Sequence, residues 1–170
     1  MSVKQELNNF GKYVVKQSRT NLTKKGKKDT GELYKSLDYN LKVSANSFEL
    51  SFVGADYLDF VDKGVKGVSS SAKAPKSPYK FGSGTGKKNG LTNGINNWVE
   101  RKRIQFRTKE GKFMSYKSTA FLIKRSIWFK GLETTNFFSR PFELAFNRLP
   151  DDLVEAYALE VEDLLNFTRK

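Results

Sequence analysis

Two runs of alternating apolar and polar residues, one on each side of a short polar break, constrain the fold of this chain more than any other feature. The break, residues 44–47, is Ser-Ala-Asn-Ser and suits a turn. Because successive side chains of a strand point to opposite faces, the pattern predicts a β-hairpin with one apolar face. The apolar positions of the two runs are Tyr39, Leu41, Val43, Phe48, Leu50 and Phe52.

An amphipathic helix is predicted before the hairpin, over residues 2–20. Val3, Leu7, Phe10 and Val14 recur at the spacing of one helix face, and basic residues lie off this stripe. After this helix, Thr30 is placed to cap a helical turn. Helices are also expected over 57–64, 91–99, 118–131 and 137–149, with a basic hairpin over 104–116 and a last helix from Pro150. The residues of the last helix that we expect to point inward are Val154, Tyr157, Ala158, Val161 and Leu165.

Residues 65–90 have no such periodicity. They are rich in Gly, Ser and Lys and contain two of the four prolines. A long segment of this kind is usually functional or disordered, so we expect a flexible basic arm. Its Gly82–Lys88 stretch departs from a phosphate-binding loop at Phe81, where the pattern needs Gly, and at Lys88, where it needs Ser or Thr. No nucleotide or other cofactor is therefore expected.

Charge is distributed unevenly along the chain, whose formal net charge is +13. Residues 63–90 hold seven lysines and no acid, and residues 101–130 hold ten basic residues and one acid. Residues 31–62 hold six acids and two lysines. Such blocks predict contact with a polyanion or with an acidic protein. With no apolar leader and no stretch near about 18 uncharged apolar residues, we expect a soluble protein made in a cytoplasm, away from membranes.

The chain contains no histidine and no cysteine. The commonest general base, the commonest metal ligand and every thiol-based site are therefore excluded, which argues against an enzyme. Two carboxylate patterns remain. Asp56, Asp59 and Asp62 would share one side of a short helix and could bind a divalent cation, but a solvated acidic face is the simpler interpretation. Glu100 and Lys102 match a nuclease-like pair that lacks a second carboxylate from a nearby strand. We expect no catalytic residue and no metal.

Basic and aromatic residues alternate over 98–107 and 113–125. This pattern is compatible with a nucleic-acid surface, in which cations contact phosphates and rings stack on bases. The simpler interpretation, which we prefer, places the rings in the core and leaves the charges to contact DNA backbone or an acidic protein. The rings concerned are those of Trp98, Phe106, Phe113 and Phe121.

Three segments in a fixed order resemble a known family. They are Asp29–Leu37 (DTGELYKSL), Tyr57–Gly64 (YLDFVDKG) and Phe138–Ala145 (FSRPFELA). They are similar to the Thr-Gly-x-Leu-x-x-Ser-Leu, Tyr-Ala-x-Tyr-Val-Glu-x-Gly and Arg-Pro-Phe-Leu-x-x-Ala segments of tail-completion, or head–tail joining, proteins of tailed bacteriophages. The resemblance covers residues 1–64 and 137–170, and the longer basic stretch between them resembles versions from phages of Bacteroidetes-type hosts.

The resemblance implies an α+β fold, in which a small antiparallel sheet is packed by the long first helix and the C-terminal helices. Residues 1–170 would form a single domain with a basic insertion at 65–136, made of the 65–90 arm and a helix-hairpin-helix at 91–136. It also implies a homo-oligomeric ring, six- or twelve-fold, in the virion neck. The ring would join the portal and adaptor to the tail or neighbouring neck rings and let the genome pass with at most non-specific contact. The residues implied as the core of the family fold are Leu33, Leu37, Tyr57, Phe60, Gly64, Pro141 and Phe142.

Opposite charges on neighbouring segments suit a subunit that presents different faces to its two neighbours. The candidate interface residues are Lys73, Lys76, Lys80, Lys87, Lys88, Arg101, Arg103, Arg107, Asp56, Asp59 and Asp62. Two other functions remain open at this point: a nucleic-acid-binding module without catalysis, and a metal-dependent nuclease that uses Asp56, Asp59 or Glu100.

Overall fold

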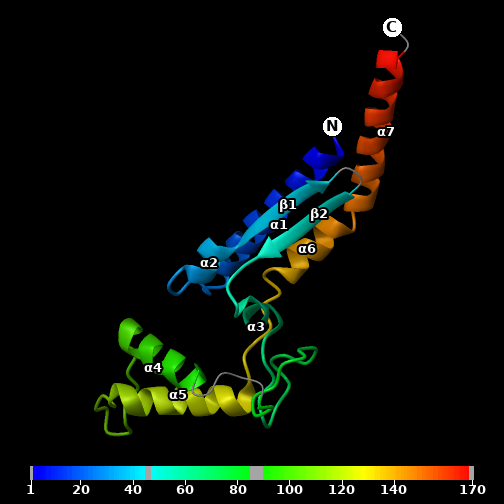
Figure 1. Ribbon diagram of the computed structural model, residues 1–170. Coiled ribbons are helices and arrows are strands. Elements are labelled where there is room, and N and C mark those ends of the chain that lie inside the picture. The colour runs from blue at the N-terminus through cyan, green and yellow to red at the C-terminus, as the bar shows by residue number, and fades with distance from the viewer. Residues whose placement is uncertain (1, 45–46, 85–89, 169–170) are drawn as a thin grey trace. The chain divides into compact units, whose positions relative to one another are not determined.

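Figure 1 shows the computed structural model, whose described residues are 2–44, 47–84 and 90–168, the last six as backbone only. The chain divides into two compact units. Unit 1 comprises residues 1–62 and 135–170, and unit 2 comprises the residues between them, 63–134. These boundaries fall next to the limits expected for the basic insertion, 65 and 136.

The fold is α+β, as predicted. In unit 1, a hairpin of two antiparallel strands is packed by the long first helix and the C-terminal helices. The elements of unit 1 are α1 (Val3–Lys24), α2 (Glu32–Ser36), β1 (Asp38–Ser44), β2 (Ser47–Val53), α3 (Leu58–Lys63, ending at the boundary), α6 (Ser139–Phe146) and α7 (Leu149–Thr168). Unit 2 contains α4 (Gly90–Lys102) and α5 (Tyr116–Lys130).

The hairpin has the single apolar face that was predicted. Tyr39 pairs with Phe52, Leu41 with Leu50, and Val43 with Phe48, so all six apolar side chains lie on one face. The face is covered over only part of its length, since Leu41, Leu50 and Phe52 pack on the core while Val43 and Phe48 are exposed near the turn. Residues 45–46 of the predicted turn lie outside the described residues.

Helix α1 covers the apolar face of the hairpin. Its predicted apolar stripe is buried in this contact. A capping box begins the helix: Gln5 N donates to Ser2 Oγ at 3.2 Å and Ser2 N donates to Gln5 Oε1 at 2.9 Å. Leu7, Phe10 and Val14 pack against the start of α7, and further along Val15 and Leu22 pack with Leu33, Leu37 and Phe137. Edge-to-face and stacked contacts among Phe10, Phe52, Phe138 and Phe142, with ring centroids 5.4–6.0 Å apart, complete this core.

The C-terminal helix α7 turns its other face inward. Leu149 and Ala156 are buried and Leu153 packs on the core, whereas the predicted inward residues Val154, Tyr157, Ala158 and Val161 are exposed. The prediction for these four residues is therefore wrong, and Leu165 lies outside the side chains described. Both sets have helical spacing, so the repeat alone could not decide between them.

No helix among the described residues is both long enough and apolar enough to cross a membrane.

Candidate functional site

The segment expected to be a flexible arm is folded within unit 2 over residues 64–84. Val65 and Leu132 exchange two backbone hydrogen bonds of 3.1 and 2.8 Å, and Val68 N donates to Trp128 O at 2.9 Å. Ser77, almost fully buried, donates from Oγ to Gly64 O at 2.7 Å. The prediction of a flexible arm is wrong for these residues, because backbone bonds to residues 128–132 anchor the segment despite its few apolar side chains. Residues 85–89 lie outside the described part.

The rest of unit 2 is the predicted helix-hairpin-helix, with a shorter hairpin than expected. Helices α4 and α5 pack on each other, and Arg107 and Phe113 form the single bridge of the connecting loop. Thr119, fully buried, accepts a hydrogen bond from Phe106 N at 3.2 Å, which fixes this loop to α5. Helix α5 begins at Tyr116, two residues before the predicted range of 118–131, and Ser115 is its N-cap.

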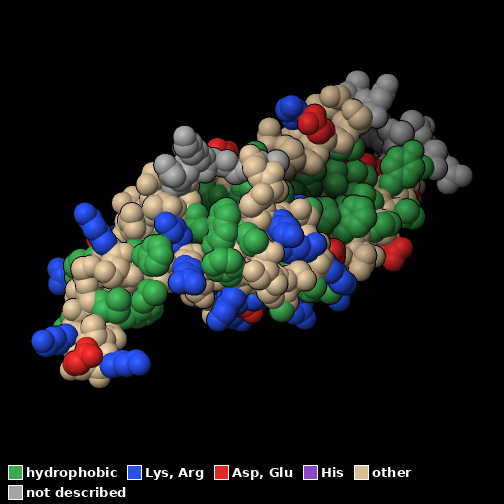
Figure 2. Space-filling model, turned by 90° about the horizontal axis from the view of Figure 1, so that it is seen from below, with side chains coloured by type: hydrophobic (Ala, Val, Ile, Leu, Met, Phe, Trp, Pro, Cys, Tyr) green, Lys and Arg blue, Asp and Glu red, His purple; other side chains and the backbone are tan. Residues whose placement is uncertain are grey.

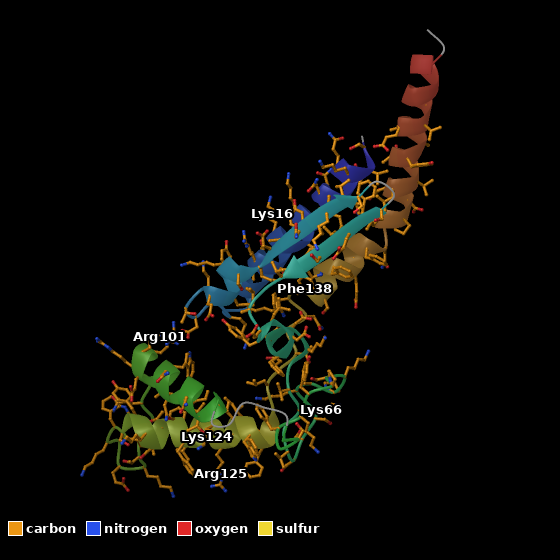
Figure 3. The ribbon with its side chains drawn as sticks, in the orientation of Figure 1. Lys16, Lys66, Arg101, Lys124, Arg125 and Phe138 are labelled. Carbon is orange, nitrogen blue, oxygen red and sulfur yellow. The ribbon has the colours of Figure 1, made fainter. Side chains whose placement is uncertain are left out.

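Unit 2 carries the whole net charge of the protein. Its sequence holds 17 basic and 3 acidic residues, giving +14, whereas the 14 basic and 15 acidic residues of unit 1 give −1. Figure 3 labels Lys66 on the 64–84 segment, Arg101 on α4, and Lys124 and Arg125 on α5. In the loop between the helices, a hydrogen bond with the Thr108 side chain holds the pKa of the Glu110 carboxyl below its usual value.

Aromatic rings are exposed among these charges. Phe113 is 61% exposed, Phe121 is 54% exposed, and Phe106 is also exposed. The Arg107 guanidinium lies over the Phe113 ring at 4.2 Å from its centroid, and Lys124 Nζ lies 5.6 Å from that of Phe121. Figure 2 shows hydrophobic side chains exposed between Lys and Arg side chains toward the left of the view. Placing these three rings in the core was therefore wrong; Trp98 is half-buried.

Most of the predicted basic interface residues reach solvent on unit 2. Lys73, Lys76 and Lys80 are exposed on the 64–84 segment, and Arg101, Arg103 and Arg107 are exposed on α4 and the loop after it. Lys87 and Lys88 lie outside the described residues. We call the exposed cations of residues 73–130, together with Phe106, Phe113 and Phe121, the basic surface of unit 2.

The predicted acidic triplet of unit 1 does not form one face. Asp56 and Asp59 are exposed, but Asp62 is 1% exposed, and its Oδ1 accepts hydrogen bonds from Phe138 N at 2.8 Å and Ser139 N at 3.2 Å. Asp62 therefore caps the start of α6, and its prediction as an interface residue is wrong. Among the residues that the structure describes, no group of three His, Cys, Asp or Glu side chains could hold a metal ion.

The residues implied as the family core divide in two. Leu33, Leu37 and Pro141 are buried, Phe142 packs among four other aromatic rings, and Gly64 is buried with a φ of 72°. Tyr57 and Phe60 are exposed, so their prediction as core residues is wrong. Partial burial and the Glu32 carboxylate, 3.4 Å from the Tyr57 hydroxyl, raise the pKa of Tyr57.

A second basic surface, which the sequence did not single out, lies on unit 1. It is an open groove of about 800 Å³ beside α1, with the side chains of Tyr34 and Tyr39 in its wall. We call it the α1 groove. The only available signal was the row of cations off the apolar stripe of α1. The groove's charged residues are Lys12, Lys16, Arg19, Lys24 and Asp38.

Comparison with known protein families, with characterised proteins and with solved structures finds no match to this chain.

Proposed function

We propose that this protein is a structural subunit of a tailed-phage virion neck, where copies assemble into a ring that joins the portal and adaptor to the tail. The observation that carries the proposal is that the three family-like segments meet in unit 1. Leu33 and Leu37 of the first segment pack in one cluster with Leu58 and Val61 of the second and Phe138 of the third. Asp62 then links the second segment to the third across 76 positions of sequence.

The separation of unit 2 from this core also supports the proposal. The residues between the second and third segments form a compact unit of their own, so the family-like core is interrupted by an added module. Its charge of +14 and its exposed rings suit a surface that contacts a partner in an assembly. We assign this surface mainly to acidic protein of the neck, because a lumen densely lined with lysine would retain the passing genome.

The location of the protein tests the proposal. Immunogold labelling of virions from the phage that encodes this chain is expected to place it at the junction of head and tail. Purified protein, or protein mixed with the portal, is expected to form rings of six or twelve subunits in negative-stain images. Absence of the chain from purified virions by mass spectrometry would overturn the neck assignment.

DNA binding by the isolated protein is expected to be weak and non-specific. At physiological salt we expect a dissociation constant for duplex DNA on the order of 10⁻⁵ M, measured by fluorescence anisotropy. The double variant Arg107→Glu/Arg125→Glu should abolish this binding, whereas Lys35→Glu on unit 1 should leave it close to wild type. Nanomolar binding with a steep salt dependence would contradict the assignment of the surface to protein.

A nucleic-acid-binding module without catalysis is the second candidate, and the exposed rings beside cations favour it. If bases stack on Phe113 and Phe121, replacing either ring by alanine should weaken binding of single-stranded DNA by about tenfold. In a neck subunit the same substitutions should leave DNA affinity unchanged. The two variants therefore separate the candidates, since both keep every charge of unit 2.

A further inference from the structure

An apolar stripe runs along the exposed side of α7. Val154 is 71% exposed, Tyr157 is 64% exposed, and Ala158 and Val161 are also exposed. These positions follow a three- and four-residue spacing, so their side chains lie on one face of the helix. Figure 1 shows the C-terminal part of α7 running past the N-terminus of α1, beyond the hairpin. A continuous apolar helix face of this kind is typical of a protein–protein contact.

The stripe has an acidic border. Asp151, Glu155 and Glu162 are exposed and lie at helical spacing along one edge of it. Residues 149–168 contain six acids and no basic residue. Two α7 helices packed stripe to stripe would bring these carboxylates together, and like charges disfavour that pairing. The stripe therefore fits a surface that combines apolar rings with positive charge.

The α1 groove combines those two properties. Val15, Tyr34 and Tyr39 supply its apolar wall, and among the described residues that line it the cations given above outnumber the acid Asp38. Arg19 is held in place, since its guanidinium donates to Tyr34 O at 3.1 Å and Leu37 O at 2.7 Å. Lys28 Nζ lies 4.0 Å from the centroid of the Tyr34 ring and adds a further positive charge beside the groove. Figure 3 labels Lys16 on this helix.

We propose that the α7 stripe of one copy of this chain docks in the α1 groove of a second copy. The inference rests on the proposed function, for which it supplies the contact between neighbouring subunits. The two rows of charge match in length: at about 1.5 Å of rise per residue, Lys12, Lys16 and Lys24 span about 18 Å and Asp151, Glu155 and Glu162 about 16 Å. Stripe and groove are different surfaces of one chain, so the contact repeats head to tail and generates a ring where the rotation closes.

Disulfide trapping tests the contact directly, because the wild-type chain has no cysteine. Tyr157→Cys and Thr20→Cys proteins, mixed under mild oxidation, should give a disulfide-linked dimer that neither protein gives alone. The matched control pairs Tyr157→Cys with Glu49→Cys on the exposed end of β2. Equal linkage to Glu49→Cys, or preferred linkage to Lys124→Cys of unit 2, would overturn the proposal.

Charge reversal tests the same contact through its energy. Two double variants, Asp151→Lys/Glu155→Lys and Lys12→Glu/Lys16→Glu, should each weaken self-association. We expect each to raise the dissociation constant of self-association, measured by sedimentation velocity, by at least about tenfold. Mixing the two variants should restore association, which a folding defect would not do. A wild-type chain that stays monomeric, or one that assembles equally well with either change, overturns the docking proposal. The neck assignment fails separately, only if virions lack the protein.

Discussion

Replacing Gly131 by alanine is expected to destabilise unit 2 by about 4 kcal/mol. Gly131 ends α5 with φ 83° and ψ 177°, a conformation that is essentially restricted to glycine. A Cβ atom there would lie 2.3 Å from Val65 O and 2.7 Å from Gly67 N, both of them backbone atoms. The substitution therefore adds backbone strain, and it pushes the two chain segments apart so that the backbone hydrogen bonds between Val65 and Leu132 are lost.

Three other glycines of unit 2 separate these two causes. Gly111 has a φ of 80° with open space around it, so Gly111→Ala should cost only about 1 kcal/mol from strain. Gly67 has no positive φ, but a Cβ would lie 2.0 Å from Phe129 O, so Gly67→Ala tests the overlap alone. Gly94 lies within α4 in open space, and Gly94→Ala should stabilise the unit by about 0.5 kcal/mol.

Tryptophan fluorescence is the appropriate measurement, since both tryptophans of the chain, Trp98 and Trp128, belong to unit 2. Urea unfolding followed by fluorescence should give Gly94→Ala as the most stable protein and the wild type as the second. Gly111→Ala, Gly67→Ala and Gly131→Ala should follow in order of decreasing stability. If the free energy of unfolding of Gly131→Ala were within about 1 kcal/mol of the wild-type value, residues 65–67 would not pack closely on residues 129–132.

The elements that were predicted well are those whose pattern and partner are both local. The hairpin pairs residues a few positions apart, so alternation predicted both the strands and their shared apolar face. The buried face of helix α1 could also be predicted, because the helix has a single apolar stripe. The charge of unit 2 was also predictable, since it depends on counting residues and not on their arrangement.

The 64–84 segment could not be predicted, because backbone groups stabilise it. Its contacts involve Gly64, Gly67 and Gly131, where the absence of a side chain lets two chain segments approach closely. Glycine, serine and lysine in a row are also the composition of a flexible linker, so composition alone indicated flexibility. What distinguishes a folded segment from a flexible linker here is the pairing of Val65 with Leu132, which lies more than 60 positions later in the chain. No local sequence pattern indicates this pairing.

The exposed rings of unit 2 were assigned to the core because aromatic residues usually are. Helices α4 and α5 form a pair with a narrow contact, in which Val99, Thr119 and Ala120 are the buried residues. Such a pair has too little surface to cover Phe113 and Phe121 as well. Helix α7 likewise has two apolar faces, and only the face with Leu149 and Leu153 packs against α1. In both places the side chains that were expected in the core are exposed.

Asp62→Ala is expected to destabilise unit 1 by roughly 3 kcal/mol. The buried carboxylate accepts hydrogen bonds from Phe138 N and Ser139 N, which begin α6, and the substitution leaves both donors without an acceptor. Phe138 also packs against both hydrophobic clusters along α1, so movement of this turn should loosen the packing around it. If the proposed neck function holds, the same variant should also lower ring formation, because Asp62 joins the second and third family-like segments.

Two variants distinguish the loss of hydrogen bonds from a general effect of removing charge. Asp62→Asn keeps an acceptor oxygen at the same place, so it should recover about half of the lost stability. Asp56→Ala removes an exposed carboxylate of the same segment and should change stability by less than about 0.5 kcal/mol. Hydrogen exchange followed by mass spectrometry should show the loss of protection in peptides covering 137–148. If Asp62→Ala and Asp56→Ala were equally stable, Asp62 would not anchor α6, and the polar link between the second and third family-like segments would contribute nothing to the stability of unit 1.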